Sequence, residues 1–204
     1  RLAHLKPSLT TLHFPTPDIA QQQLQERTHP AWQRLKFDEL LAQQLSMRKH
    51  YRERRERQAP VLKAKNSLTK KLLAALPFPL TGAQKKVMGE ISVDLTLAHP
   101  MQRLLQGDVG SGKTIVAAFA ALQAIENGYQ AALMAPTEIL TEQHYRKLSA
   151  LLEPLGVNVV WLTGSMKSKE KLQYKQIVTE GTAQLVIGTH ALFQEPVSFR
   201  DLAL

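Results

Sequence analysis

Residues 107–114 read Gly-Asp-Val-Gly-Ser-Gly-Lys-Thr and fit the spacing G-x-x-x-x-G-K-[ST] at every fixed position. Glycines let such a loop bend so that backbone N–H groups face phosphate oxygens. Lys113 can reach the β- and γ-phosphates, and Thr114 can offer its hydroxyl to Mg²⁺, so these two are the candidate catalytic residues. We therefore expect a nucleoside triphosphate to bind through Gly107, Asp108, Val109, Gly110, Ser111, Gly112, Lys113 and Thr114, with Thr114 as metal ligand.

The segments on either side of the loop have the pattern that a phosphate site needs. Apolar residues predict a short strand over 103–106, and residues 114–127 predict a helix that ends before Gly128. A chance match in a glycine-rich turn is the alternative, and this strand–loop–helix context argues against it.

Farther along the chain, apolar runs alternate with helical patterns. Strands are expected at 131–135, 157–162 and 184–187, and helices at 138–152 and 167–179, after a helix capped by Thr81. This alternation predicts an α/β fold: a parallel sheet of four strands with helices on both faces and ligands at the carboxyl ends of the strands.

The N-terminal part has a different pattern. Three prolines within residues 1–27 predict an irregular connection. A helix is expected from Pro30, capped by Thr28 or His29, and a shorter one after Ser67. We expect Trp32 and Phe37 to pack rather than to stack on bases. The predicted domains are a mainly helical, basic segment over 1–76 and a nucleotide-binding domain over 77–204.

The positive charge lies in the N-terminal segment. Residues 1–76 hold 15 Lys and Arg against 6 Asp and Glu, whereas residues 77–204 hold 11 of each. The basic run at 48–57 suits phosphate neutralisation. It equally suits a solvated helix face, because Glu53 and Glu56 stand at helical spacing from Arg57 and Arg52. The sequence leaves both interpretations open.

The amino-acid composition argues against several classes of protein and of functional site. The chain has no cysteine, which argues against disulfides, cysteine-based zinc sites and thiol catalysis. No apolar run approaches the roughly 20 residues that span a bilayer, and no signal-peptide pattern is found at the start. We expect a cytoplasmic protein, and a first residue other than Met suggests a piece of a longer chain.

Five segments, at 78–84, 107–114, 135–140, 162–165 and 187–192, resemble in order and spacing the ATP-dependent DNA helicases of superfamily two. Residues 72–78 and 188–194 favour the members that act on branched DNA. The resemblance is strong from residue 72 onward and weak before it. It implies the first, RecA-like motor domain of an enzyme that uses ATP and Mg²⁺, with forked or branched DNA as partner, without a membrane and as a monomer.

The resemblance also implies roles for particular residues. Gln84 would read the adenine edge, with Phe78 lining the adenine pocket. Locally, Thr81-x-x-Gln84 is also a capping box, and Phe78 can simply pack in the core. The segments that would hold the DNA backbone are Pro136-Thr137-Glu138, Gly164-Ser165 and Thr189-His190. Alternatively, Thr137 only caps a helix and Gly164 only turns the chain.

In the family that the chain resembles, an acidic Mg²⁺ motif and a second motor domain follow the position of Leu204. Without them we expect the chain alone to bind nucleotide weakly and to hydrolyse it negligibly. Two other functions stay open at this point: a small-molecule P-loop kinase or nucleotidase, and a noncatalytic module that binds DNA through its basic N-terminal helix.

Overall fold

A computed structural model describes residues 2–164, 166, 168–190, 192 and 197–204. Its chain contacts divide it into two compact units, Arg1–Arg57 and Gln58–Leu204. The functional division that the sequence suggests, between residues 76 and 77, stays a prediction.

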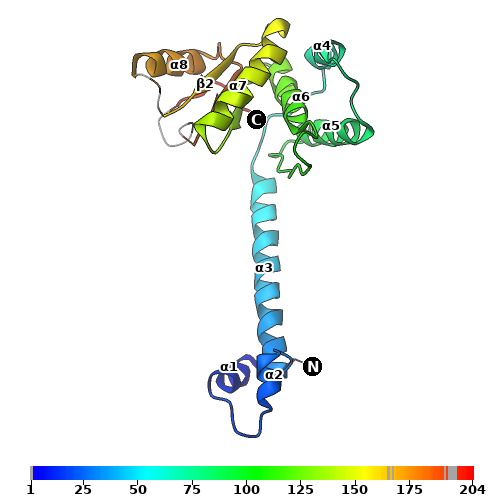
Figure 1. Ribbon diagram of the computed structural model, residues 1–204, viewed down its shortest axis with the longest axis vertical. Coiled ribbons are helices and arrows are strands. Elements are labelled where there is room, and N and C mark those ends of the chain that lie inside the picture. Colours follow the sequence, from blue (N-terminus) through cyan, green and yellow to red (C-terminus); the bar gives the residue numbers. More distant parts are fainter. Residues whose placement is uncertain (1, 165, 167, 191, 193–196) are drawn as a thin grey trace. The chain divides into compact units, whose positions relative to one another are not determined.

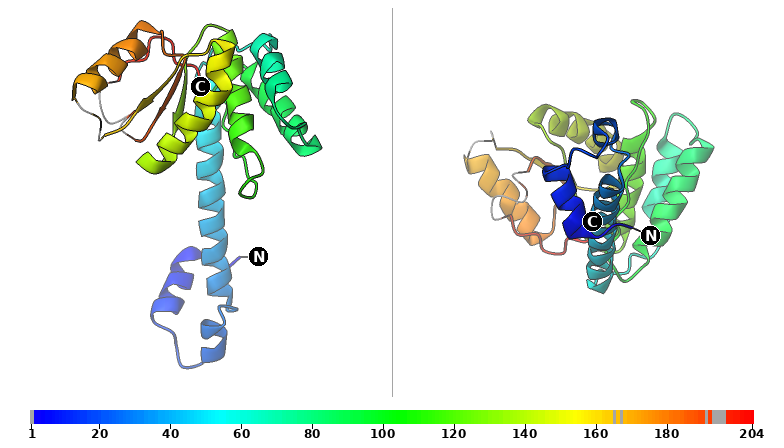
Figure 2. Two further views of the ribbon diagram at one scale, coloured as in Figure 1. Left: turned by 45° about the horizontal axis from the view of Figure 1, so that its top comes forward. Right: turned by 90° about the horizontal axis from the view of Figure 1, so that it is seen from below.

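The first unit consists of α1 (Leu5–His13), α2 (Gln21–Gln25) and the long α3 (Pro30–Glu56). His29 caps α3, since its Nδ1 accepts a hydrogen bond of 3.1 Å from the Ala31 N–H. The prediction of an irregular connection over residues 1–27 is wrong. α1 forms because it packs along α3, as Figures 1 and 2 show, where it buries Ser8 and Ala31.

Trp32 and Phe37, in the first half of α3, differ in their surroundings. Trp32 is half-buried, and the Arg27 guanidinium lies 5.2 Å from the centre of its ring. Phe37 is 46% exposed, so the expectation that it packs is wrong for this residue. Leu40 and Leu45 on the same helix are exposed as well.

The second unit alternates helices and strands. Its elements are α4 (Ser67–Ala75), α5 (Gly82–Leu95), α6 (Lys113–Glu126), β1 (Ala131–Met134), α7 (Glu138–Leu152), the 3₁₀ helix η1 (Glu153–Leu155), β2 (Val159–Leu162), α8 (Ser168–Glu180) and β3 (Leu185–Gly188).

The sheet is parallel, in the order β1-β3-β2, and helices cover both of its faces (Figure 1). Alternate residues of a strand point to opposite faces. Leu185 and Ile187 accordingly join the core cluster formed with α6 and α7, whereas Val186 joins Val178 of α8 in another. The predicted α/β class, with a parallel sheet and two helical layers, is confirmed.

The predicted strand over 103–106 is wrong, and the sheet formed by the described residues has three strands instead of the predicted four. Residues 103–106 make no backbone hydrogen bond to another described residue, and Leu104 is 81% exposed. Arg103 instead pairs with Glu90 and Asp94 of α5, at 2.6 and 2.7 Å. A strand needs a neighbour with free backbone groups, and an apolar pattern alone does not supply one.

The edge of β1 that does not face β3 is paired with the last residues of the chain. Gln130 and Leu202 form a parallel bridge. The Gln130 N–H donates to the Asp201 carbonyl at 2.8 Å, and the Ala132 N–H donates to the Leu204 carbonyl at 2.8 Å. Residues 201–204, which we call the edge segment, therefore extend the sheet beside β1.

A tertiary contact caps α4. Asn66, directly before this helix, has a left-handed backbone (φ 59°) and gives no side-chain cap. The Glu126 carboxylate at the end of α6 takes that place and accepts hydrogen bonds from the N–H groups of Leu68 and Thr69. The negative charge also suits the positive end of the helix dipole. α4 is thereby fixed to α6, the helix that follows the phosphate loop.

Candidate functional site

The phosphate loop leads directly into α6. Gly110 and Gly112 have φ values of +85° and +83°, which side chains with a Cβ rarely adopt. Gly112 is the N-cap of α6, and no described side chain caps this helix end. The Ile115 N–H donates to the Gly112 carbonyl at 3.0 Å, whereas the N–H groups of Lys113 and Thr114 make no backbone hydrogen bond to a described residue. These two groups therefore retain their hydrogen-bonding capacity for phosphate oxygens, at the positive end of the helix dipole.

Lys113 and Gly107 hold the loop together. The Lys113 ammonium donates to the carbonyl oxygens of Gly107 and Asp108, at 2.7 and 2.8 Å. A Cβ on Gly107 would come within 2.7 Å of the Ser111 Oγ, so a larger residue at this position would require the Ser111 side chain to move. Thr114 is half-buried in the first turn of α6. The residues present thus fit a triphosphate, with the Thr114 hydroxyl as a ligand for Mg²⁺.

Gln84 connects the start of α5 to this loop. Its Oε1 accepts from the Thr81 N–H at 2.9 Å, and its own N–H donates to the Thr81 Oγ1 at 3.2 Å, which completes the predicted capping box. Its Nε2 donates to the Ser111 carbonyl at 2.9 Å. This last contact was not predicted, because no local pattern relates residues 27 positions apart.

Phe78 is 47% exposed, so it does not pack in the core. Recognition of adenine by Gln84 and Phe78 stays a prediction.

The predicted DNA-contacting residues follow the three strands in turn: 136–138 after β1, Gly164 after β2 and 189–190 after β3. Because the strands are parallel, these carboxyl ends share one edge of the sheet. A Cβ on Gly164 would lie 3.8 Å from a Glu138 carboxylate oxygen, so the side chain at the start of α7 reaches the turn after β2. Ser165 lies outside the described residues.

These residues differ in exposure. Pro136, Thr137, Glu138, Gly164 and His190 are exposed, whereas Thr189 is buried. The Thr137 Oγ1 also accepts from the Leu140 N–H at 3.3 Å. Thr137 therefore caps α7. Its contact with a DNA backbone stays a prediction.

The phosphate loop lies at the same edge as the strand ends. α6 ends at Glu126 and a short turn leads into β1, so the end of α6 lies beside the start of that strand. The start of α6 therefore lies toward the carboxyl ends of the strands, as Figure 1 shows. One edge of the sheet thus combines a phosphate-binding loop with three polar strand ends.

A hollow of about 410 Å³ lies elsewhere, between α4, α5 and α6, and is lined by Leu73, Leu80 and Phe119 among others. None of the predicted site residues lines it. Cavity size therefore does not point to the phosphate loop, which is the predicted nucleotide site.

Burial, and secondarily the charge of Lys147, lowers the pKa of His144 on α7. The described residues contain no cluster of three or more His, Cys, Asp or Glu that would hold a metal ion. None of the described helices has the length and apolar character needed to cross a membrane.

Comparisons with known proteins agree with this geometry. Residues 81–203 match a family model described as DEAD/DEAH box helicase. The ATP-dependent DNA helicases RecG of Haemophilus influenzae and Escherichia coli K12 are each 50% identical over 200 residues, which is 98% of this chain and 29% of each relative.

A solved structure described as RecG bound to a three-way DNA junction superimposes with a TM-score of 0.79. It is 42% identical and covers 85% of this chain and 24% of that one. The chain thus spans less than a third of the length of these relatives. The resemblance inferred from the sequence motifs is confirmed, and the chain belongs to the DEAD/DEAH box helicase family, with similarity to RecG over nearly its whole length.

Proposed function

We propose that the whole protein containing this chain is an ATP-dependent DNA helicase that remodels forks and junctions during repair and recombination. One observation carries the proposal: the phosphate loop and the three polar strand ends share one edge of the parallel sheet. The similarity to RecG supports branched DNA as the substrate.

The nucleotide half of the site is assigned to the loop and α5. Loop N–H groups and Lys113 bind the phosphates, while the amide of Gln84 reads adenine next to Phe78. Thr114 holds Mg²⁺, which when bound draws negative charge from the β- and γ-phosphates.

The DNA half is assigned to the strand ends, through 136–138, Gly164-Ser165 and Thr189-His190. Hydroxyls and backbone N–H groups bind a sugar-phosphate backbone without regard to base identity, which a translocating enzyme requires. Contacts of this kind would allow the protein to move along DNA of any base sequence.

The proposal includes several expectations for the protein in solution. We expect the 204-residue chain alone to bind ATP weakly and to hydrolyse it negligibly. The whole protein acts as a monomer in the cytoplasm. A DNA-binding measurement on this chain tests whether DNA is its partner. Gel filtration of the whole protein tests whether it is a monomer.

The decisive experiment measures ATP hydrolysis by the full-length protein with and without forked DNA. We expect forked DNA to stimulate hydrolysis and Lys113→Ala to abolish the stimulation, because the phosphates lose their cation. Lys71→Ala removes an exposed lysine of α4 and serves as the control. Phosphorylation of a small metabolite without DNA, or full stimulation of the Lys113→Ala variant, would contradict the helicase proposal.

The basic run of α3 is assigned to phosphate contact as an accessory role. It is helical, Arg48 and Arg52 are exposed, and Arg54 and Arg55 lie over the ring of Tyr51. Each phosphate contact contributes about 0.9 to the slope of log K against log salt. Arg48→Gln with Arg52→Gln should therefore lower that slope by about 1.8, and an unchanged slope would leave the run as a solvated helix face.

A further inference from the structure

The hollow of about 410 Å³ between α4, α5 and α6 has apolar walls, to which Leu73, Met88 and Phe119 contribute one side chain from each helix. Gly89 of α5 also lines it, and a Cβ added there would meet no atom within 4 Å. Small-molecule sites usually have volumes of roughly 300–1,000 Å³ and apolar walls with a few polar groups. The polar groups of this hollow therefore decide which kind of molecule it would bind.

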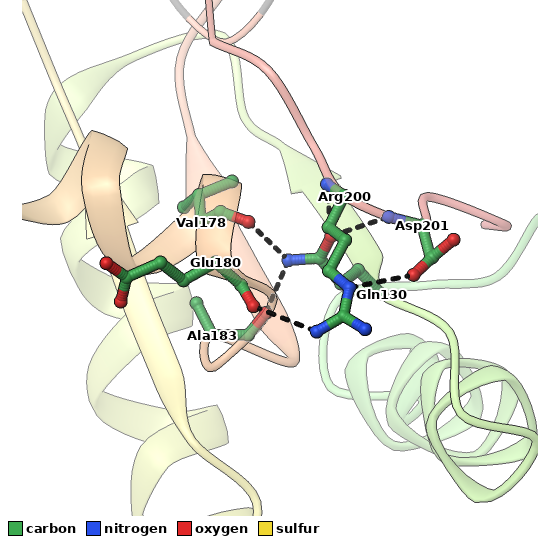
Figure 3. Close-up of polar contacts among 6 residues, drawn as sticks. All are labelled: Gln130, Val178, Glu180, Ala183, Arg200 and Asp201. Carbon is green, nitrogen blue, oxygen red and sulfur yellow. Dashed lines mark hydrogen bonds and ion pairs between the residues drawn. The ribbon is translucent and has the colours of Figure 1, made fainter.

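Gln130, directly before β1, shows how a buried amide is normally bonded. The residue is 3% exposed. Its Nε2 donates to the carbonyls of Val178 and Ala183, at 2.9 and 2.7 Å. Its Oε1 accepts from the N–H groups of Arg200 and Asp201, at 2.9 and 3.1 Å, as Figure 3 shows. These bonds fix the edge segment beside β1 and use every conventional hydrogen-bonding position of the side chain.

Gln123 of α6, which lines the hollow, is buried as well, at 6% exposure, but its amide is only half bonded. Its Nε2 donates to the carbonyls of Leu62 and Ser92, at 2.7 and 3.1 Å. Its Oε1 accepts no hydrogen bond from a described residue and is not closed off from solvent. Buried polar groups normally have a hydrogen-bond partner. A molecule in the hollow can supply one with an N–H group.

Two exposed lysines line the same hollow, Lys70 on α4 and Lys85 on α5. Neither ammonium forms an ion pair with a described carboxylate. Among the described residues that line the hollow, none is Asp or Glu. The local charge is therefore positive only, and it favours an anion.

We propose that this hollow is a binding site for a small aromatic anion that carries an N–H group. The ring contacts Met88 and Phe119, and the N–H donates to the Oε1 of Gln123. The anionic group lies at Lys70 and Lys85. None of these residues belongs to the phosphate loop, so the proposal does not depend on the proposed ATPase function.

The first test titrates the full-length protein with anilinonaphthalene sulfonate, a fluorescent probe that has aromatic rings, an N–H group and a negative charge. Gly89→Met fills the hollow with a side chain that α5 accepts, and it should abolish the saturable fluorescence. Gly82→Met is the matched control. A Cβ on Gly82 also meets no atom within 4 Å, on the same helix, but this residue does not line the hollow.

A second variant tests the charge and covers the case in which Gly89→Met does not fold. Lys70→Gln with Lys85→Gln leaves the walls intact and should weaken binding of the sulfonate about fivefold. Phenylnaphthylamine has the same rings and N–H group without the sulfonate, and its binding should stay within about twofold. Lys71→Gln with Lys86→Gln, the neighbouring exposed lysines that do not line the hollow, should change neither probe.

A competition experiment tests the hydrogen bond to Gln123. Indole carboxylate and benzofuran carboxylate have nearly the same shape and charge, but only the indole has an N–H group. Indole carboxylate should displace the sulfonate probe at about fivefold lower concentration, because it satisfies the Oε1 of Gln123.

Three results would overturn the proposal. The first is saturable binding that persists in Gly89→Met. The second is an equal loss in the two double lysine variants. The third is equal competition by the indole and benzofuran acids, since apolar contact, as with a helix of another protein, would then account for the hollow. A failure of the full-length protein to hydrolyse ATP would contradict the helicase proposal and would leave these titrations unaffected.

Discussion

Gln84 provides a sharp test of the nucleotide site, because two roles of its amide predict different results. As a capping residue and loop support, it makes two side-chain hydrogen bonds, to the Thr81 N–H and to the Ser111 carbonyl. As an adenine reader, it would also donate to and accept from the base edge. Gln84→Ala removes both roles, whereas Thr81→Ala removes only the hydroxyl half of the capping box.

The structure gives the size of each effect. Thr81→Ala loses one capping bond, for about 1 kcal/mol of unfolding free energy. Gln84→Ala loses two partly exposed bonds, for about 1–2 kcal/mol. At about 2–4 °C per kcal/mol for a domain of this size, both variants should melt a few degrees lower. If Gln84 reads adenine, its loss should weaken ATP binding by a further 1–3 kcal/mol, or about 5- to 150-fold.

The assay compares ATP and GTP as competitors for a fluorescent nucleotide on the full-length protein, with melting followed in parallel. We expect Gln84→Ala to lose its preference for ATP over GTP, because guanine presents the opposite pattern of donors and acceptors to the amide. Thr81→Ala should keep the preference. A Gln84→Ala variant that melts lower and still prefers ATP as strongly as the wild type would refute adenine reading.

Three further predictions concern single residues. Gly112→Ala should abolish ATP binding in the fluorescence assay, because the Cβ would meet the Gln84 amide at a φ of +83°. Glu126→Ala should cost about 1–2 kcal/mol in urea unfolding and speed exchange in α4, which loses its cap. Burial lowers the pKa of His144 below its ordinary 6.5, so the unfolded chain takes up the proton first as pH falls. Stability should therefore decrease below about pH 6.5 and level off below the folded pKa, and His144→Gln should remove this decrease in pH-dependent melting.

Local sequence patterns were enough to predict the helices whose N-cap residue and capping partner are close neighbours in the sequence. Thr81 with Gln84 and Thr137 begin α5 and α7 where the sequence predicts, since the capping partner lies three residues away. The loop spacing likewise predicts a phosphate site, because its glycines and lysine lie within eight residues, and phosphate binding there stays a prediction. The order of the strand-end motifs places them on one edge once the strands are known to be parallel.

What the sequence did not predict depends on contacts between distant residues. α1 forms on the surface of α3, so no pattern within residues 1–27 reveals it. The run at 103–106 has the composition of a strand but no backbone partner. Gln130 and Glu126 carry no local signal at all, because a buried amide or a distant carboxylate is recognised only by the backbone groups that it meets. The adenine and DNA contacts need bound partners to be tested.

The connections around Gln130 also set the order in which this unit can fold. β1 pairs with segments far along the chain, and the side-chain bonds of Gln130 span 48 to 71 residues. Closing such loops costs chain entropy before any sheet contact compensates for it, whereas α6 and α7 need only local bonds. We therefore expect the helices to form early and β1 to join the sheet late. The residue that fixes the edge segment would thereby also govern the slowest step of folding.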